Sequence, residues 1–293
     1  MLAAVTVLAA CSKGSEPDTR PPDVPIGLTV TRGDERVRLT WDAVSNKDLA
    51  GYHAYHREGT TGTPVQGTLV TDTEAWVPGL TNGTEYSFYV TSVDEAGNES
   101  EPSSSVTATP NNETSLTQQG WTAWEAGDYA SAGLLFEDAL TFDLIHADAH
   151  NGLGWTALRQ GDLSEAEDRF SSANNYGLTT QDARVGLLAI YRDAPGKLTL
   201  AMANGIFILQ NDPAYVFSHD PGIDADLVRV MLAQVYFRLG ESYFAEAQLL
   251  MDTVVPGNGL DPGDSGTWMV DTTPYSTYAA SLLALIQSAF DLL

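Results

Sequence analysis

The sequence predicts a multidomain protein in which an all-β sandwich is followed by an all-α helical repeat region. Its 293 residues are enough for two domains of ordinary size, each able to bury its own core. Over residues 23–110, apolar and polar residues alternate in short runs separated by turn residues, which is the pattern of half-buried strands. Over residues 113–293 the apolar period becomes helical, and part of the pattern recurs every 34 residues.

The N-terminus begins with an apolar run of ten residues that leads to Cys11, the only cysteine of the chain. The sequence Leu8-Ala9-Ala10-Cys11 resembles the bacterial lipobox, in which a signal peptide is cleaved before a lipid-modified cysteine. The resemblance implies a signal peptide over residues 1–10, a lipid on Cys11 and a flexible linker over residues 11–22. Ser12 after the cysteine favours the outer membrane by the same resemblance.

Two features depart from that pattern. The run has no basic residues, and it is shorter than the about 15–30 residues expected of a secretory signal. A misplaced start codon or a truncated gene end would explain both, and the alternative is an ordinary N-terminus without a lipid. No apolar run in the chain reaches the about 20 residues that a membrane-spanning helix needs, so a lipid on Cys11 would be the membrane anchor.

The β-rich region contains seven predicted strands, over residues 26–31, 36–42, 51–57, 68–71, 74–77, 84–93 and 104–109. Seven short strands in about 90 residues are typical of a sandwich. The landmark residues follow in the order Pro25-x-x-Leu28-x-Val30, Leu39-x-Trp41, Tyr52-x-x-Tyr55, Leu80, Tyr86-x-Phe88-x-Val90 and Asp94-x-x-Gly97-Asn98. This series closely resembles a fibronectin type III domain. The resemblance implies that Trp41 is the core tryptophan and that Leu80 and Tyr86 form the tyrosine corner.

The helical region repeats itself at an offset of 34 residues. The recurring segments are Gly120-Trp121-Thr122-Ala123 with Gly154-Trp155-Thr156-Ala157, Gly127-Asp128 with Gly161-Asp162, and Ala132, Phe136 and Ala139 with Ala166, Phe170 and Ala173. The Gly-Asp pairs suit the turn after a first helix, and the alanines allow two helices to approach closely. This helix–turn–helix pattern resembles the tetratricopeptide (TPR) repeat. The resemblance implies a solenoid whose concave face binds peptides or protein surfaces.

Later repeats are looser, and the polar segment 111–115 before the first helix is predicted as a hinge with Ser115 as the N-cap. Helices are expected over residues 181–191, 198–210, 224–240, 243–254 and 275–292. The segments between them include an insertion over residues 211–223 and a loop over residues 256–274. We therefore expect three or four helical hairpins and a final helix.

The TPR resemblance places a partner-binding groove on the first helices of the first two repeats. Its predicted residues are Trp121, Trp124, Asn151, Trp155 and Arg159. Tryptophan is enriched at the centres of binding interfaces, so we interpret the three indoles as an aromatic strip for an apolar or mildly basic segment. The alternative is that neighbouring helices, the β-domain or the last helix already cover the rings.

Composition and motifs argue against several other functions. A net charge of -25 repels nucleic acid, and no glycine-rich phosphate loop or other cofactor motif is present in the sequence. The pair His146 and His150 lacks an evident third metal ligand, and the acidic loops do not follow EF-hand spacing. The segment Gly263-Asp264-Ser265-Gly266 copies a serine-protease motif but is predicted as a surface turn. We predict no catalytic residue, cofactor or metal site, and no enzyme.

The leading hypothesis is a non-enzymatic lipoprotein of the cell envelope, held in the outer membrane and facing the periplasm or the cell surface. Its TPR groove would act as a scaffold that holds a peptide segment of an envelope or secreted protein, and the fibronectin type III domain would act as a spacer or adhesive module. The alternative is a carbohydrate-binding accessory lipoprotein of a polysaccharide-processing system.

Overall fold

A computed structural model describes residues 17–292 of the chain, so the predicted lipidation site at Cys11 lies outside the described residues. The chain divides into two compact units, with the boundary between Asn112 and Glu113. Each unit is described by itself. Within residues 17–292, no helix combines the length and the apolar character that a membrane span requires.

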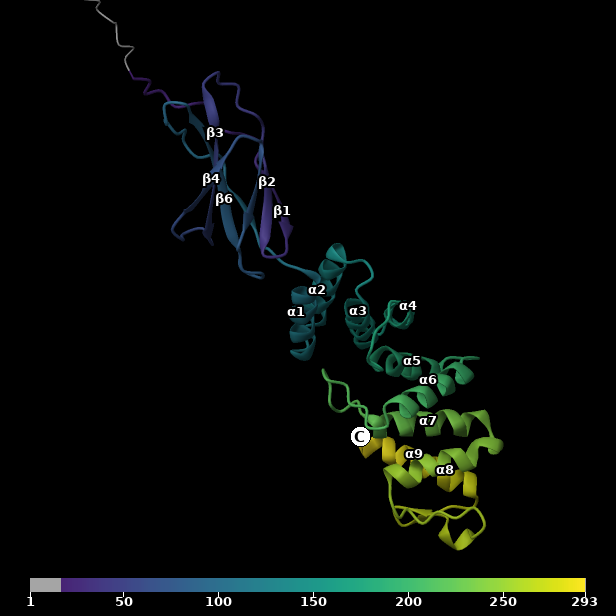
Figure 1. Ribbon diagram of the computed structural model, residues 1–293. Coiled ribbons are helices and arrows are strands. Elements are labelled where there is room, and N and C mark those ends of the chain that lie inside the picture. Colours follow the sequence, from purple (N-terminus) through teal and green to yellow (C-terminus); the bar gives the residue numbers. More distant parts are fainter. Residues whose placement is uncertain (1–16, 293) are drawn as a thin grey trace, which may run out of the picture. The chain divides into compact units, whose positions relative to one another are not determined.

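The first unit is a sandwich of two antiparallel sheets (Figure 1). One sheet has the order β1-β2-β5 and contains β1 (Thr29–Gly33), β2 (Arg36–Thr40) and β5 (Glu74–Pro78). The other has the order β4-β3-β6-β7 and contains β3 (Leu49–Glu58), β4 (Val65–Val70), β6 (Tyr86–Asp94) and β7 (Val106–Ala108). All seven strands that the sequence predicts are present, with ends shifted by a few residues.

The sandwich core lies between the inward faces of the two sheets, where the period-two pattern places its apolar residues. Trp41 is buried there and meets Tyr52 edge to face, with ring centroids 5.3 Å apart. The hydroxyl of Tyr86 accepts a hydrogen bond from the backbone N–H of Thr81, at 3.1 Å, beside the buried Leu80. The core tryptophan and the tyrosine corner are thus where the sequence predicts them.

The second unit is built of helical hairpins. Over residues 113–292 the α-helices are α1 (Glu113–Glu125), α2 (Tyr129–Phe142), α3 (Ala147–Gln160), α4 (Leu163–Asn175), α5 (Asp182–Asp193), α6 (Leu198–Asn211), α7 (Ala225–Leu239), α8 (Phe244–Val254) and α9 (Tyr278–Leu292). Consecutive helices pair as α1/α2, α3/α4, α5/α6 and α7/α8, and α9 packs on α7 and α8. The loop between α8 and α9 carries the short strands β8 (Met269–Val270) and β9 (Thr273–Pro274).

Two phenylalanines hold successive hairpins together. The ring of Phe136 lies between Gly120 and Gly152, where an added Cβ on Gly152 would come within 2.3 Å of the ring. One repeat later, the ring of Phe170 lies in the same way between Gly154 and Gly186. Glycine at these positions lets the helices close on a flat aromatic ring, which explains the recurrence of Gly and Phe at an offset of 34.

The start of the helical unit differs from the sequence prediction. The sequence predicts Ser115 as the N-cap, but α1 already begins at Glu113. The hydroxyl of Ser115 lies within the first turn and accepts a hydrogen bond from the side-chain amide of Gln119, at 3.2 Å. A carboxylate at Glu113 suits the positive end of the helix dipole, so the acidic residue rather than the serine marks the first turn.

Candidate functional site

The candidate site is the inner face of the helical unit, which we define as the face formed by α1, α3, α5, α7 and α9. These helices pack side by side in that order. The predicted insertion between α6 and α7 does not extend away from this face. Residues 212–224, which we call the plug, run back along it as a small antiparallel hairpin (Figure 1).

The plug is an extended segment with alternating side chains. The backbone N–H of Phe217 donates to the carbonyl of Ile223 at 2.9 Å, and the N–H of Ala225 donates to the carbonyl of Tyr215 at 2.8 Å. Tyr215 and Phe217 are buried, whereas Val216 and Ser218 are exposed. This is the period of a β-strand with one face covered.

Phe217 occupies the aromatic strip that the sequence predicts as a binding surface. Its ring stacks on Trp155 with centroids 4.7 Å apart, and it meets Trp121 and Trp124 edge to face at 5.8 Å and 5.9 Å. Edge-to-face and offset contacts are the favoured geometries of aromatic pairs. The three tryptophans consequently retain exposures of only 1%, 4% and 3% for Trp121, Trp124 and Trp155.

Polar contacts fasten the tip of the plug. The imidazole of His219 stacks on Trp121, and its Nδ1 lies 2.7 Å from a carboxylate oxygen of Glu125 at the end of α1. The carboxylate of Asp220 pairs with the guanidinium of Arg159 at 2.6 Å. That guanidinium also lies 5.3 Å from the ring centre of Trp124. The plug therefore brings one ring cluster and one carboxylate to the ends of α1 and α3.

A buried hydrogen bond fastens the base of the plug. The hydroxyl of Tyr215 donates to Asp182 at 2.7 Å, and the hydroxyl of Thr180 donates to the same carboxylate at 2.5 Å. Burial raises the pKa of Asp182, against the lowering effect of these two hydrogen bonds. Burial and the neighbouring Asp182 also raise the pKa of Tyr215, so this hydroxyl stays a donor across the physiological range.

The predicted groove residues therefore come together, but they do not form an open strip. The open surface expected from the sequence is corrected here, because the chain's own plug covers the three indoles. Asn151 is also fully buried, and neither of its amide atoms has a hydrogen-bond partner within the described residues. Arg159 is partly exposed and engaged by the plug. The alternation of Tyr215, Phe217 and His219 between Pro213 and Pro221 is the sequence signal that could have identified this covering strand.

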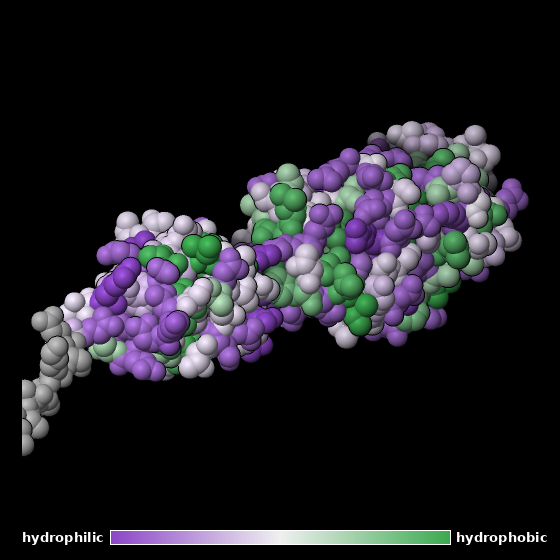
Figure 2. Space-filling model, turned by 90° about the horizontal axis from the view of Figure 1, so that it is seen from above, coloured by the Kyte–Doolittle hydropathy of each residue, from purple (hydrophilic) through white to green (hydrophobic). Residues whose placement is uncertain are grey.

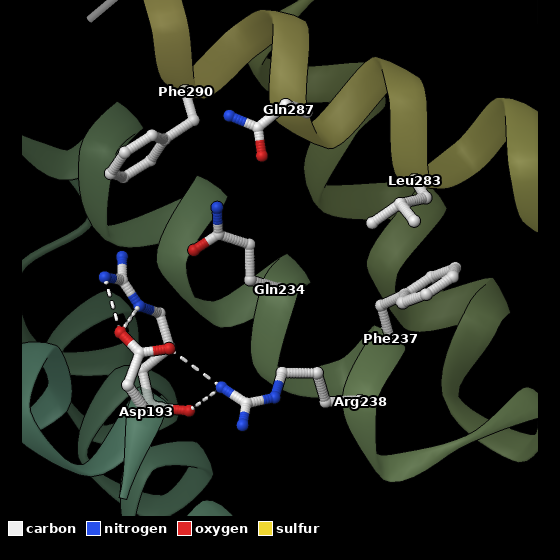
Figure 3. Close-up of a pocket in the computed structure, with 8 residues that line it drawn as sticks. Asp193, Gln234, Phe237, Arg238, Leu283, Gln287 and Phe290 are labelled. Atoms are coloured by element: carbon white, nitrogen blue, oxygen red, sulfur yellow. Dashed lines mark hydrogen bonds and ion pairs between the residues drawn. The ribbon is translucent and has the colours of Figure 1, made fainter.

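The far end of the inner face is open. A cavity of about 280 Å³ lies between the end of α5, the second half of α7 and α9, and we call it the open pocket. Its apolar walls are Phe237, Leu283 and Phe290. Figure 3 shows the amide groups of Gln234 and Gln287 pointing towards each other across the space between α7 and α9.

Two arginines close one side of the open pocket. Arg192 at the end of α5 pairs with Asp193 at 2.8 Å, and its guanidinium lies 5.3 Å from the ring centre of Phe290. Arg238 on α7 pairs with the same Asp193 at 2.9 Å (Figure 3). One carboxylate thus serves two guanidinium groups, and the residues lining the pocket carry one surplus positive charge.

The surface of the sandwich carries two aromatic features. Trp76 on β5 is 52% exposed, and the guanidinium of Arg36 lies 4.6 Å from its ring centre. On the other sheet, Tyr55 and Tyr89 stack on each other with centroids 4.7 Å apart, so each ring covers a face of the other. Burial and a hydrogen bond to Glu99 raise the pKa of Tyr55 to about 12. Figure 2 shows one face of the molecule, on which hydrophobic residues stand in small groups between polar ones.

The acidic residues that the sequence singles out largely serve the chain's own turns. Asp224 caps α7 by accepting from the backbone N–H groups of Asp226 and Leu227, each at 3.0 Å. Asp264 of the protease-like motif accepts from the N–H of Gly266 at 2.9 Å, in a short surface turn between α8 and α9. His150 lies with its Nε2 3.1 Å from the carbonyl of Leu144.

One further acidic group belongs to the sandwich. Carboxylate oxygens of Asp18, Asp48 and Asp94 lie within 4.8 Å of one another. The carboxylate of Asp94 accepts hydrogen bonds from the side chain and backbone of Asn98 and from the N–H of Ala96, at 2.8–2.9 Å. The hydrogen bond from the Asn98 side chain is the main cause that lowers the pKa of Asp94. These bonds close the turn after β6.

Comparison with known proteins identifies the first unit. The family described as the fibronectin type III domain matches residues 21–109. The chain is 40% identical over 116 residues to the chitinase Chi52 of Paenibacillus xylanexedens, covering 38% of this chain and 20% of that protein. It is 35% identical over 134 residues to chitinase A1 of Niallia circulans (45% and 18%), and 40% identical over 111 residues to exoglucanase A of Cellulomonas fimi (36% and 12%).

These relatives share a module and not a whole protein, because the chain spans a fifth or less of their length. Among solved structures, an Fn3-like protein from Clostridium thermocellum is 23% identical, with a TM-score of 0.27 over 30% of this chain and 92% of that chain. The family match agrees with the sandwich topology and with the core tryptophan and tyrosine corner described above. Residues 21–109 form a fibronectin type III domain, and an all-α unit follows it.

Proposed function

We propose that this protein is a non-enzymatic lipoprotein of the cell envelope whose helical unit holds a segment of a protein partner along its inner face. One observation carries the proposal: this face already holds an extended segment, the plug of the chain itself, through rings, a buried hydrogen bond and ion pairs. Helical repeat units characteristically use such faces to bind extended peptides, and the TPR resemblance of the repeats agrees with this use.

The size of the open pocket favours a side chain over a metabolite. Pockets for small molecules and cofactors usually measure about 300–1,000 Å³ and enclose most of their ligand. The open pocket measures about 280 Å³ and is lined by three apolar side chains, two amides and two arginines. Amide side chains can pair with both the N–H and the C=O of an extended peptide. The pocket therefore suits one side chain of a polypeptide and the backbone beside it.

The anchor and the spacer complete the proposal. The lipobox resemblance of residues 8–11 supports a lipid on Cys11 and an outer-membrane location, and the fibronectin type III domain would hold the helical unit away from that anchor. Replacing Cys11 by serine should move the full chain from the membrane fraction to the soluble fraction. A Cys11→Ser protein that remains in the membrane fraction with unchanged mass would contradict the lipid anchor.

Site-specific photo-crosslinking tests the binding face. Leu283 in the open pocket is 47% exposed, and Leu249 on α8 is an exposed leucine outside the pocket lining. A benzophenone side chain is placed at one position or the other in the full chain, in cells that produce the protein naturally. Adducts from position 283 and not from position 249 are the expected result. Equal labelling from both positions, or adducts only from position 249, would contradict binding along the inner face.

A second candidate function rests on the exposed Trp76 and on the relatives named as chitinases and an exoglucanase. Under this proposal the first unit is a carbohydrate-binding accessory module. Binding of the full chain to insoluble chitin and cellulose tests it, with Trp76→Ala as the variant. Tyr89→Ala is the comparison, because that ring already stacks on Tyr55. Retention that Trp76→Ala abolishes supports a carbohydrate role, and no retention of the wild-type chain contradicts it.

A further inference from the structure

Three arginines mark the same place on successive first helices. Arg159, Arg192 and Arg238 are each the next-to-last residue of their helix, in α3, α5 and α7. A cation in the last turn is favoured by the helix dipole, so this position suits arginine without a ligand. What differs among the three is the carboxylate that each one meets, and this difference distinguishes the plugged part of the inner face from the open pocket.

The plug shows how this face binds a segment. Its aromatic residue Phe217 is inserted among the three tryptophans, and Asp220, three residues later, reaches the arginine at the end of α3. The backbone between them turns, with the N–H of Asp220 donating to the carbonyl of Phe217 at 3.2 Å. An aromatic residue and an acidic residue three positions later thus form one recognition unit of the plug.

The open pocket repeats the receptor side of this arrangement. Phe237 and Phe290 supply rings and Leu283 an exposed aliphatic wall, next to Arg238 in the position that Arg159 has on α3. Arg192 and Arg238 share the single carboxylate of Asp193. Because the whole chain carries a net charge of -25, a site with surplus positive charge is a local exception that distinguishes acidic from neutral segments.

We propose that the open pocket binds an extended segment of a partner protein in which an aromatic residue is followed three positions later by Asp or Glu. The aromatic ring enters between Phe237 and Leu283, and the carboxylate meets Arg238. The amide of Gln234, which has no hydrogen bond within the described residues, pairs with the backbone of the segment. This inference rests on the proposed function and specifies the partner segment for the same face.

Peptides that copy the plug test this recognition directly. The probe is a fluorescein-labelled peptide with the sequence of residues 213–223, titrated with the full chain and followed by fluorescence anisotropy. Two further peptides replace its phenylalanine by alanine or its aspartate by asparagine. We expect the parent peptide to bind and each altered peptide to bind about tenfold more weakly, which corresponds to the loss of one charge-assisted hydrogen bond or one buried ring.

Protein variants place the peptide on the structure. Arg238→Gln should weaken binding of the parent peptide about tenfold, and Leu283→Asp should abolish it. Arg169→Gln on α4 and Leu249→Asp on α8 are matched controls that should leave binding unchanged, since both lie outside the pocket lining. Circular dichroism verifies that each variant keeps its helices.

Three results would overturn the inference. They are no binding of the parent peptide at millimolar concentration, equal binding of the aspartate and asparagine peptides, and weakening by Arg159→Gln but not by Arg238→Gln. The last result would place the peptide where the plug lies. Crosslinking from position 283 without any dependence on Arg238 or on the acidic residue would leave the proposed function standing and remove this inference alone.

Discussion

The imidazole of His219 lies face to face with the indole of Trp121, with ring centroids 3.9 Å apart and planes 4° from parallel. This contact joins the tip of the plug to the first helix of the helical unit. It converts a tryptophan that the sequence assigns to a partner surface into part of the chain's own packing. Only the face beyond the plug, between α5, α7 and α9, remains open as a pocket.

Phe217→Ala should destabilise the helical unit strongly. The ring is fully buried among three indoles, and its removal leaves a cavity that the rigid helices cannot close. We expect the free energy of unfolding to fall by about 3–5 kcal/mol. Urea unfolding of the full chain, followed by ellipticity at 222 nm, measures the loss. Val216→Ala in the same strand should change it by less than about 0.5 kcal/mol, because Val216 is exposed.

Gly152→Ala should weaken the junction between the first two hairpins. The new methyl group would collide with the Phe136 ring, and relieving the overlap should cost about 1–3 kcal/mol. Gly133→Ala is the control, because its nearest neighbour is the Thr156 methyl at 3.6 Å, an ordinary contact. Gly133 lies inside α2, so alanine there should stabilise by about 0.5–1 kcal/mol. Opposite signs in the two urea midpoints are the expected outcome, and equal signs would refute this packing.

Asp182→Asn should make the helical unit more stable at neutral pH. Burial raises the pKa of Asp182, so this group favours the folded state below its unfolded pKa, and the contribution is lost as pH rises through the folded pKa. Asparagine can still accept from the Tyr215 hydroxyl but does not ionise. The advantage of the variant in urea midpoint should therefore grow as pH rises from the acidic range and disappear at low pH. An advantage that does not change with pH would show that ionisation of Asp182 is not the cause.

The fibronectin type III domain should respond to acid in the opposite direction. The Asn98 side chain and neighbouring backbone N–H groups lower the pKa of Asp94, so its contribution is present at neutral pH and is lost as pH falls through the folded pKa. Asn98→Ala removes the largest cause of that shift and should make the domain less sensitive to acid. Hydrogen exchange of peptides from β3 and β6 measures this. An unchanged acid dependence in the variant would argue against Asp94 as its source.

Sequence periodicity was sufficient for most of the fold. Alternation fixed the strand of Val37 and Leu39, because one buried face demands period two, and the offset of 34 residues identified the glycine and phenylalanine positions that pack hairpins together. Gly152 and Gly186 fit the same offset and hold the second side of each ring. These features are local or repeated, so the sequence shows them directly.

The state of the groove could not be predicted in the same way. The position of Trp121 on its helix was correct, but its exposure depends on a contact with His219, far along the chain. Pro213 and Pro221 mark the plug as an insertion without indicating where it lies. The open pocket likewise depends on how α9 packs on α7, which places Phe290 near Arg192. Long-range packing of this kind has no local signature in one sequence.

Hydroxyl-radical footprinting of the wild-type full chain tests most directly the division of the inner face into a plugged part and an open pocket. Oxidation of each side chain is followed by mass spectrometry, with the exposed Trp76 as the internal reference. We predict that Trp121, Trp124 and Trp155 are oxidised much more slowly than Trp76, whereas Leu283 in the open pocket is readily oxidised. Oxidation of the three tryptophans as fast as Trp76 would show that the plug is not seated on them and would contradict the account.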